Sequence, residues 1–305
     1  MTTSRPARPA PALKPLRGVR VLSLALNLPG PAALMRLKAM GASCLKAEPP
    51  GPKGAPAGTS GDPMGQYNPQ AYAEMHDGIK VLGIDLKTER GQATLHKQLA
   101  RTDVLLTSFR PSALAKLQLG WKALHQQYPA LSVVAIVGAP GARAEEPGHD
   151  LTYLADAGLV TGLELPPTLF ADMGGALMAS EAVLQAVLAQ QRSGKESFQE
   201  VALSDAAAWL ALPRTWGLTQ PKGAVGGAHA GYRVYPCKDG RVAVAALEPH
   251  FAAALSTAAG LSLSDSRALF QPATHAAIAA FLLGKTRRQL DALALAKDIP
   301  LHTLA

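Results

Sequence analysis

The sequence predicts an α/β protein with a large domain on a parallel sheet and a smaller α+β domain. Short apolar runs typical of buried strands alternate with helix-like segments through the first half of the chain. After a glycine-rich passage, residues 223–231, this alternation gives way to a hairpin pattern. We therefore expect a flexible tail over residues 1–17, a large domain over 18–225 and a small domain over 226–305.

The first repeat of the alternation covers residues 18–51. Residues 18–25 form a strand-like run, and the second proline of the turn Asn27–Pro31 suits the first position of a helix. The segment SCLKAEPPG then predicts a strand that stops at Pro-Gly. This βαβ unit is typical of a Rossmann-like, nucleotide-binding-type domain, but the absence of a GxGxxG loop disfavours a dinucleotide.

The next segments continue the pattern. Residues 52–71 are rich in Gly, Pro and Ser and predict a surface loop. Residues 79–109 predict a strand, a helix that starts at Lys87–Thr88, and a second strand; SVVAIVGAP supplies one more. Helices are expected over residues 173–193 and 203–212.

The small domain has its own signals. Lys238–Gly240 forms a turn between two alternating runs, which predicts a β-hairpin over residues 231–247. The Ala/Leu-rich last fifty residues predict helices.

Composition narrows the kinds of partner. No window holds the roughly 18 consecutive apolar residues of a membrane helix, and Cys44 and Cys237 lack metal or disulfide spacing. We expect a cytoplasmic protein that uses no membrane and no metal. The net charge of +8 suits a polyanionic small molecule. With aromatic residues at only 5%, stacking platforms for nucleic acid are not expected.

Two segments carry residues suited to proton transfer. Gly148-His149-Asp150 and Asp172-Met173-Gly174-Gly175 each precede or begin a predicted helix. Removing a proton next to a carbonyl needs one base, and inverting that carbon needs an acid on the opposite face. His149 and Asp172 are suitable types, with capping of a helix as the alternative for each. Asp150 can orient the imidazole or cap the helix, and the cap is favoured.

Other polar residues follow predicted strands. Glu248 comes directly after VAVAAL, where it is either a site residue or a solvated turn carboxylate. Arg110 and Lys87 follow DVLLTSF and GIDL, positions where a phosphate finds both charge and backbone N–H groups. Ser204-Asp205 lacks a GxSxG elbow, which argues against a serine hydrolase.

These segments, in this order, resemble the family III CoA-transferases, most closely their α-methylacyl-CoA racemase branch. The resemblance runs from LRGVRVLSLALNLPGP through GIDLK, TSFRPS, GHDLTY and ADMGG to VAALEPHF. It implies that Asp172 and His149 are the acid/base pair and that Glu248 assists them. It also implies contacts to CoA from three places, namely Arg110, the segment Gly148 to Tyr153 with Asp150, and the run Ile84, Asp85, Leu86 and Lys87.

The resemblance further implies an activity and an assembly. The expected reaction is racemisation of 2-methylacyl-CoA thioesters through an enolate, with backbone N–H groups of Asp172, Met173 and Gly174 helping to hold the charge. Coenzyme A is then part of the substrate, and no separate cofactor is needed. A CoA-transferase with an aspartyl intermediate at Asp172 and a non-catalytic acyl-CoA-binding protein remain alternatives. The resemblance implies the family fold, shortened at its C-terminal end, and assembly as a homodimer.

Overall fold

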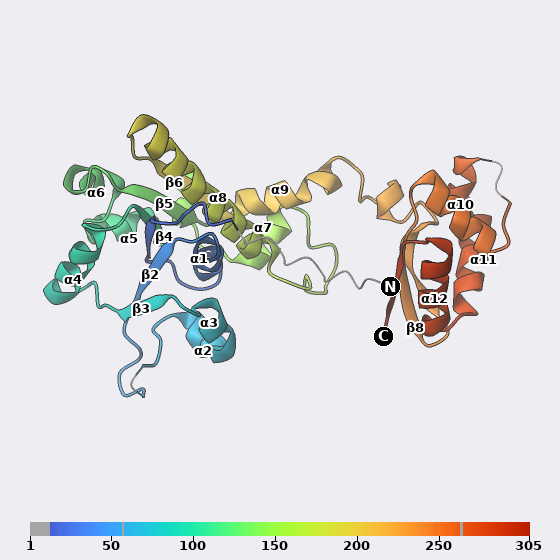
Figure 1. Cartoon of the computed structure of the whole chain (residues 1–305), viewed down its shortest axis with the longest axis horizontal. Coiled ribbons are helices and arrows are strands. Elements are labelled where there is room, and N and C mark those ends of the chain that lie inside the picture. Colours follow the sequence, from blue (N-terminus) through green and yellow to red (C-terminus); the bar gives the residue numbers. More distant parts are fainter. Residues whose placement is uncertain (1–12, 57, 263–264) are drawn as a thin grey trace, which may run out of the picture. The chain divides into compact units, whose positions relative to one another are not determined.

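A computed structural model describes residues 13–56, 58–262 and 265–305 of the chain. The chain divides into two compact units, Met1–Leu210 and Ala211–Ala305, which Figure 1 colours along the sequence. The predicted tail lies outside the described residues up to residue 12, and within its remainder Leu16 is buried in the core. Across the described residues, no helix combines the length and the apolar character needed to cross a membrane.

The larger unit contains a parallel sheet of six strands in its described part. The strand order is β3-β2-β1-β4-β5-β6, so the order reverses between β1 and β4. This order confirms the predicted Rossmann-like α/β domain. The strands are β1 (Arg20–Ser23), β2 (Ser43–Glu48), β3 (Lys80–Gly83), β4 (Val104–Thr107), β5 (Ser132–Val137) and β6 (Phe198–Ala202).

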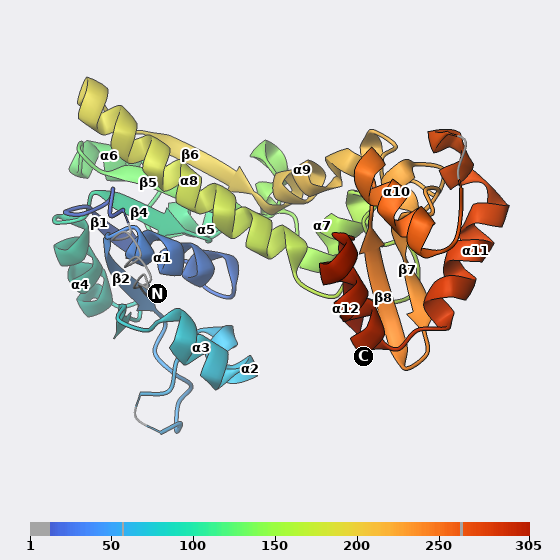
Figure 2. The same cartoon turned by 45° about the vertical axis from the view of Figure 1, so that its right-hand side comes forward.

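Helices cover both faces of this sheet (Figure 2) because its strands are apolar on both sides. Val21 and Leu106 pack in the core beneath α1 (Pro29–Ala39) and α8 (Phe170–Ser193). Their neighbours Leu22 and Leu105 pack in the opposite core, beneath α4 (Glu89–Leu99), α5 (Pro111–Lys116) and α6 (Trp121–Gln127). A 3₁₀ turn, η1 (Gly141–Glu145), precedes α7 (Asp150–Asp156), and α9 (Leu203–Thr215) follows β6.

The expected loop over residues 52–71 is partly wrong, because α2 (Pro63–Tyr67) and α3 (Pro69–Met75) form there. Each helix begins with a proline, which needs no N–H donor at that position. The carboxylate of Asp62 accepts from the Met64 N–H, and Asn68 accepts from the Ala71 N–H, so both helices are capped. Two of the prolines that suggested a loop, Pro63 and Pro69, are therefore helix starts.

The smaller unit contains the predicted hairpin, formed by β7 (Tyr232–Cys237) and β8 (Gly240–Ala245). A third strand, β9 (Leu301–Leu304), pairs antiparallel with β8, so the expectation of helix over the last residues is wrong there. Around this sheet lie η2 (Ala224–Gly226), α10 (Pro249–Ala258), η3 (Ser266–Phe270), α11 (Pro272–Leu283) and α12 (Arg287–Lys297). Their core is separate from those of the larger unit.

Candidate active site

A cavity of about 160 Å³ lies at the carboxyl ends of β1, β4 and β5. Asn27, Arg110 and Gly138 line it from the loops after these three strands, and His149 and Asp172 complete it. The strand order reverses between β1 and β4, which is where ligands bind in open α/β sheets. The structure thus brings together the two residues that the sequence selected for proton transfer.

His149 occupies the N-cap position of α7, with extended backbone (φ −143°, ψ 169°). The capping is done by Thr152, whose hydroxyl oxygen accepts from the His149 N–H at 3.0 Å and also donates to the His149 carbonyl at 2.7 Å. Among the described residues, the imidazole itself makes no capping hydrogen bond. The ring is exposed and lines the cavity, so it is available to a ligand.

Asp172 is the third residue of α8 and is half-buried. Burial raises the pKa of its carboxyl to about 6, and the nearby Asp150 carboxylate adds to this, whereas His149 opposes it. A helix start favours a carboxylate anion, but here the cost of desolvation is larger. The carboxyl is therefore able to accept and donate a proton near neutral pH.

Asp150 does not act as the cap that the sequence favoured, because it is the first residue of α7 itself. Its side chain is buried and accepts from the Asp172 N–H at 3.0 Å, which ties α7 to the start of α8. The Met173 N–H donates to the Leu169 carbonyl at 3.0 Å. The expectation that the N–H groups of Asp172, Met173 and Gly174 hold enolate charge is therefore wrong for Asp172 and Met173, since both already have partners.

Tyr153 explains the glycine that precedes His149. A Cβ added at Gly148 or at Gly138 would collide with the Tyr153 hydroxyl, so the ring fits only because both positions lack a side chain. Burial raises the pKa of Tyr153, and the charge of Asp172 contributes. The phenol is therefore held protonated on the wall of the cavity.

A second cavity, of about 380 Å³, is lined by four of the residues expected to contact CoA, whereas Arg110, Gly148 and Tyr153 line the first cavity. The run from Ile84 to Lys87 lines one side after β3, and Glu48, the last residue of β2, lines another. Phe109 lines both this cavity and the one that contains Asp172. The two cavities therefore share a wall, as a ligand with a long polar part and a reactive end would require.

One predicted site residue lies outside the larger unit, and three lining residues were not predicted. Glu248 belongs to the smaller unit, where it is exposed at the N-cap position of α10. Asn27, Phe109 and Glu48 were not singled out as site residues from the sequence. The position of Asn27 before Leu-Pro-Gly-Pro is a signal for a turn with positive φ. Lys46, inside the apolar strand SCLKAE, is a signal for a buried cation next to Glu48.

Comparison with known proteins places this chain in a family. The profile of CoA-transferase family III matches residues 16–305, and the chain belongs to that family. The α-methylacyl-CoA racemase of Mus musculus is 32% identical over 268 residues, which cover 82% of this chain and 66% of the relative. The Probable fatty acyl-CoA transferase Rv3272 of Mycobacterium tuberculosis is 33% identical over 219 residues, covering 69% and 54%.

A third relative, the succinyl-CoA:D-citramalate CoA-transferase of Chloroflexus aurantiacus, is 32% identical over 219 residues, covering 67% of this chain and 51% of the relative. The chain spans between about half and two thirds of the length of these curated relatives. A crystal structure of Rv3272 superposes with a TM-score of 0.79 at 26% identity, covering 96% of this chain and 83% of the other. A CAIB/BAIF family protein from Brucella suis superposes with a TM-score of 0.77 at 23% identity, covering 96% and 85%. These matches confirm the fold, and the relatives include both racemases and transferases.

Proposed function

We propose that this protein racemises 2-methylacyl-CoA thioesters by exchanging the α-proton between two bases. The observation that carries the proposal is that His149 and Asp172 line one cavity. Burial raises the pKa of the Asp172 carboxyl to about 6, so this group can take up and release a proton near neutral pH. An imidazole and a carboxyl that line the same cavity can serve as acid and base in the two directions of a racemisation.

In the proposed reaction, one of the two groups removes the proton from the α-carbon. The C–H electron pair moves into the bond to the thioester carbonyl carbon, and the carbonyl oxygen becomes an enolate oxygen. The other group then donates its proton to the opposite face, and the electron pair returns to form the new C–H bond. His149 and Asp172 end in exchanged protonation states, and exchange with water restores them.

The CoA part of the substrate is proposed to occupy the cavity lined by Ile84, Asp85, Leu86 and Lys87. The positive charges of Lys87 and Arg110 suit its phosphates. Phe109 lines both cavities, and the pantetheine arm is proposed to run past its ring to the cavity that holds Asp172. Coenzyme A enters as part of the substrate, so the proposed reaction needs no other cofactor.

The test is incubation of the purified protein with one enantiomer of a 2-methylacyl-CoA in deuterated water. Mass spectrometry and chiral analysis should show deuterium at the α-carbon together with the epimer. His149→Ala and Asp172→Ala should each abolish epimerisation. Retention of the starting enantiomer without deuterium uptake by the wild-type protein would refute the proposal.

A CoA-transferase is the second candidate, because a transferase and a racemase match this chain at the same 32% identity. In that reaction Asp172 attacks the thioester, CoA leaves as the thiolate, and an aspartyl anhydride forms. Transfer of CoA to an added carboxylic acid, with loss on Asp172→Ala and retention on His149→Ala, would support it. A protein that binds acyl-CoA but does neither reaction would be a non-catalytic member.

We also propose a homodimer in which Glu248 assists the site, as the family resemblance implies. Light scattering of the purified chain should then give twice the mass of one chain, and Glu248→Gln should lower racemisation. A monomer with full activity would contradict this.

A further inference from the structure

The enolate oxygen of the proposed reaction is stabilised by hydrogen-bond donors. The N–H groups of Asp172 and Met173 are already bonded to Asp150 and Leu169. A side chain on another wall of the cavity can supply a donor.

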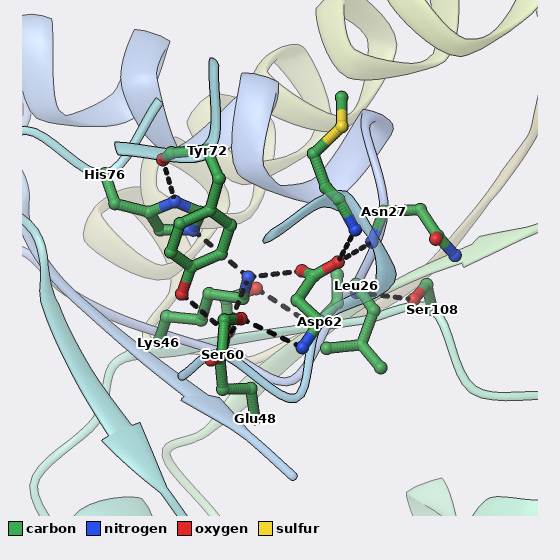
Figure 3. A network of polar contacts seen from close by, with 12 residues as sticks. Leu26, Asn27, Lys46, Glu48, Ser60, Asp62, Tyr72, His76 and Ser108 are labelled. Carbon is green, nitrogen blue, oxygen red and sulfur yellow. Dashed lines mark hydrogen bonds and ion pairs between the residues drawn. The ribbon is translucent and has the colours of Figure 1, made fainter. Parts of the chain in front are cut away.

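Asn27 provides such a donor. It follows β1, lines the cavity with Asp172 and is exposed, and no hydrogen bond joins its carboxamide to any described residue. Its backbone has φ 62°, in the left-handed region that asparagine tolerates better than most residues. In Figure 3 its side chain extends away from the neighbouring polar cluster, which leaves the carboxamide free.

The backbone around Asn27 is fixed at two successive N–H groups. The Leu26 N–H donates to the Ser108 hydroxyl oxygen at 3.1 Å, just beyond the end of β4. The Asn27 N–H donates to Oδ1 of Asp62 at 3.0 Å. Asp62 is fully buried, so this second bond is shielded from water. The carboxylate therefore holds the strained turn in one conformation.

The Asp62 carboxylate is held in turn by the buried Lys46 ammonium, which also contacts Glu48 and His76 (Figure 3). We call these four residues the Lys46 cluster. The Lys46 ammonium is fully buried and donates to Asp62 Oδ2, to Glu48 Oε2 at 3.0 Å and to His76 Nε2 at 3.1 Å. His76 Nδ1 lies 2.6 Å from the Tyr72 carbonyl, which only accepts, so Nδ1 carries the proton and Nε2 accepts. All three ammonium hydrogens thus have partners.

The loop that carries Asp62 is closed against β2. Ser60 donates to Glu48 Oε1 at 2.6 Å and accepts from the Asp62 N–H at 3.0 Å. A Cβ at Gly61 would collide with the Pro49 carbonyl, so the loop returns closely onto the end of the strand. Glu48 also lines the expected CoA cavity. One buried cluster therefore fixes a wall of each cavity.

We propose that Asn27 is a further substrate-contacting residue, whose carboxamide donates to the thioester carbonyl, and that Asp62 is its positioning residue. This inference rests on the proposed α-proton exchange. When the α-proton leaves, the carbonyl oxygen gains negative charge, and the N–H···O bond from Asn27 strengthens. Asp62 acts only through the Asn27 turn, and Lys46 keeps its carboxylate in place.

The test compares four single variants by deuterium exchange. Asn27→Gly removes the carboxamide and tolerates the positive φ, and Asn27→Asp replaces the donor with an acceptor. Each should lower kcat by about 10- to 100-fold with a smaller change in KM. Asp62→Asn should lower kcat in the same way. Tyr72→Phe removes a 2.8 Å bond to Glu48 of the same cluster without touching Asn27, and it should change kcat by less than about twofold.

A double variant separates positioning from general destabilisation. If Asp62 acts through Asn27, then Asn27→Gly combined with Asp62→Asn should be no slower than Asn27→Gly alone. Additive losses, or an Asn27→Gly protein as fast as wild type, would overturn the inference. If Asp62→Asn does not fold, as circular dichroism would reveal, the two Asn27 variants still decide the substrate contact.

Calorimetry distinguishes this inference from the proposed reaction. Isobutyryl-CoA carries the thioester carbonyl and free CoA does not. Asn27→Gly should therefore weaken the binding of isobutyryl-CoA and leave the binding of free CoA unchanged. Weakened isobutyryl-CoA binding without any wild-type exchange would refute the racemase and support the Asn27 contact. Normal exchange by the wild-type protein, together with unchanged kinetics and binding in Asn27→Gly, would support the racemase and refute the Asn27 contact.

Discussion

Replacing Asp172 by asparagine should stabilise the protein at neutral pH while removing its proposed chemistry. The pKa of this carboxyl is raised from 3.8 to about 6, chiefly by burial. One pKa unit corresponds to about 1.4 kcal/mol, so ionising Asp172 in the folded state costs roughly 3 kcal/mol at most. Asparagine has nearly the same shape and carries no charge to desolvate.

The sign of the pH dependence follows from which state binds more protons. The folded protein keeps Asp172 protonated up to about pH 6, whereas the unfolded chain loses that proton near pH 3.8. The free energy of unfolding therefore falls as the pH rises through this window, and the full cost is present above it. Asp172→Asn should be more stable than wild type by about 1 to 3 kcal/mol at pH 7.5. The difference should shrink toward pH 4.

Urea unfolding at pH 4.0, 5.0, 6.0 and 7.5 measures this difference through the transition midpoints, provided the slopes agree. Asp156→Asn, an exposed carboxyl on α7, is the matched control and should change stability by less than about 0.5 kcal/mol at each pH. A variant that is no more stable than wild type at pH 7.5 would refute the reasoning. So would a gain that is the same at pH 4.0.

Further predictions follow from the same residues. In deuterium exchange, kcat/KM for both enantiomers should change together as the pH passes through about 6, because either direction needs the same number of protons on Asp172 and its partner base; rates that stay constant across this range would contradict a role for the Asp172 carboxyl. Gly148→Ala should destabilise the protein by about 1 to 3 kcal/mol in thermal unfolding, because its Cβ meets Tyr153; an unchanged Tm would show that the ring moves freely. Lys46→Met should lower the free energy of unfolding by about 3 to 5 kcal/mol in urea titrations, since it leaves buried carboxylates unpaired; a loss below about 1 kcal/mol would contradict this. Lys87→Ala should weaken CoA binding several-fold in calorimetry at low salt and less at high salt, and equal affinities would exclude a phosphate contact.

The strand and helix pattern was predictable because it depends on local periodicity. The buried strands read as apolar runs, and the Thr88 side chain caps α4 where the sequence placed a helix start. The Lys238–Gly240 turn joins β7 to β8 as expected. The loop over residues 52–71 was misjudged because proline marks both a break and a first helical position, and only the caps at Asp62 and Asn68 distinguish the two.

The sequence by itself determined the α/β class, the family and the choice of His149 and Asp172, because residue types and short motifs carry that information. Only the tertiary structure decided how these groups behave. The raised pKa of Asp172 comes from burial and from Asp150, which lies on another helix. The hydrogen bond from the Asn27 N–H to the Asp62 carboxylate joins segments 35 residues apart, and no local pattern specifies it. Proton affinity and backbone geometry depend on neighbours in space, and these are fixed only when the sheet and its loops have folded.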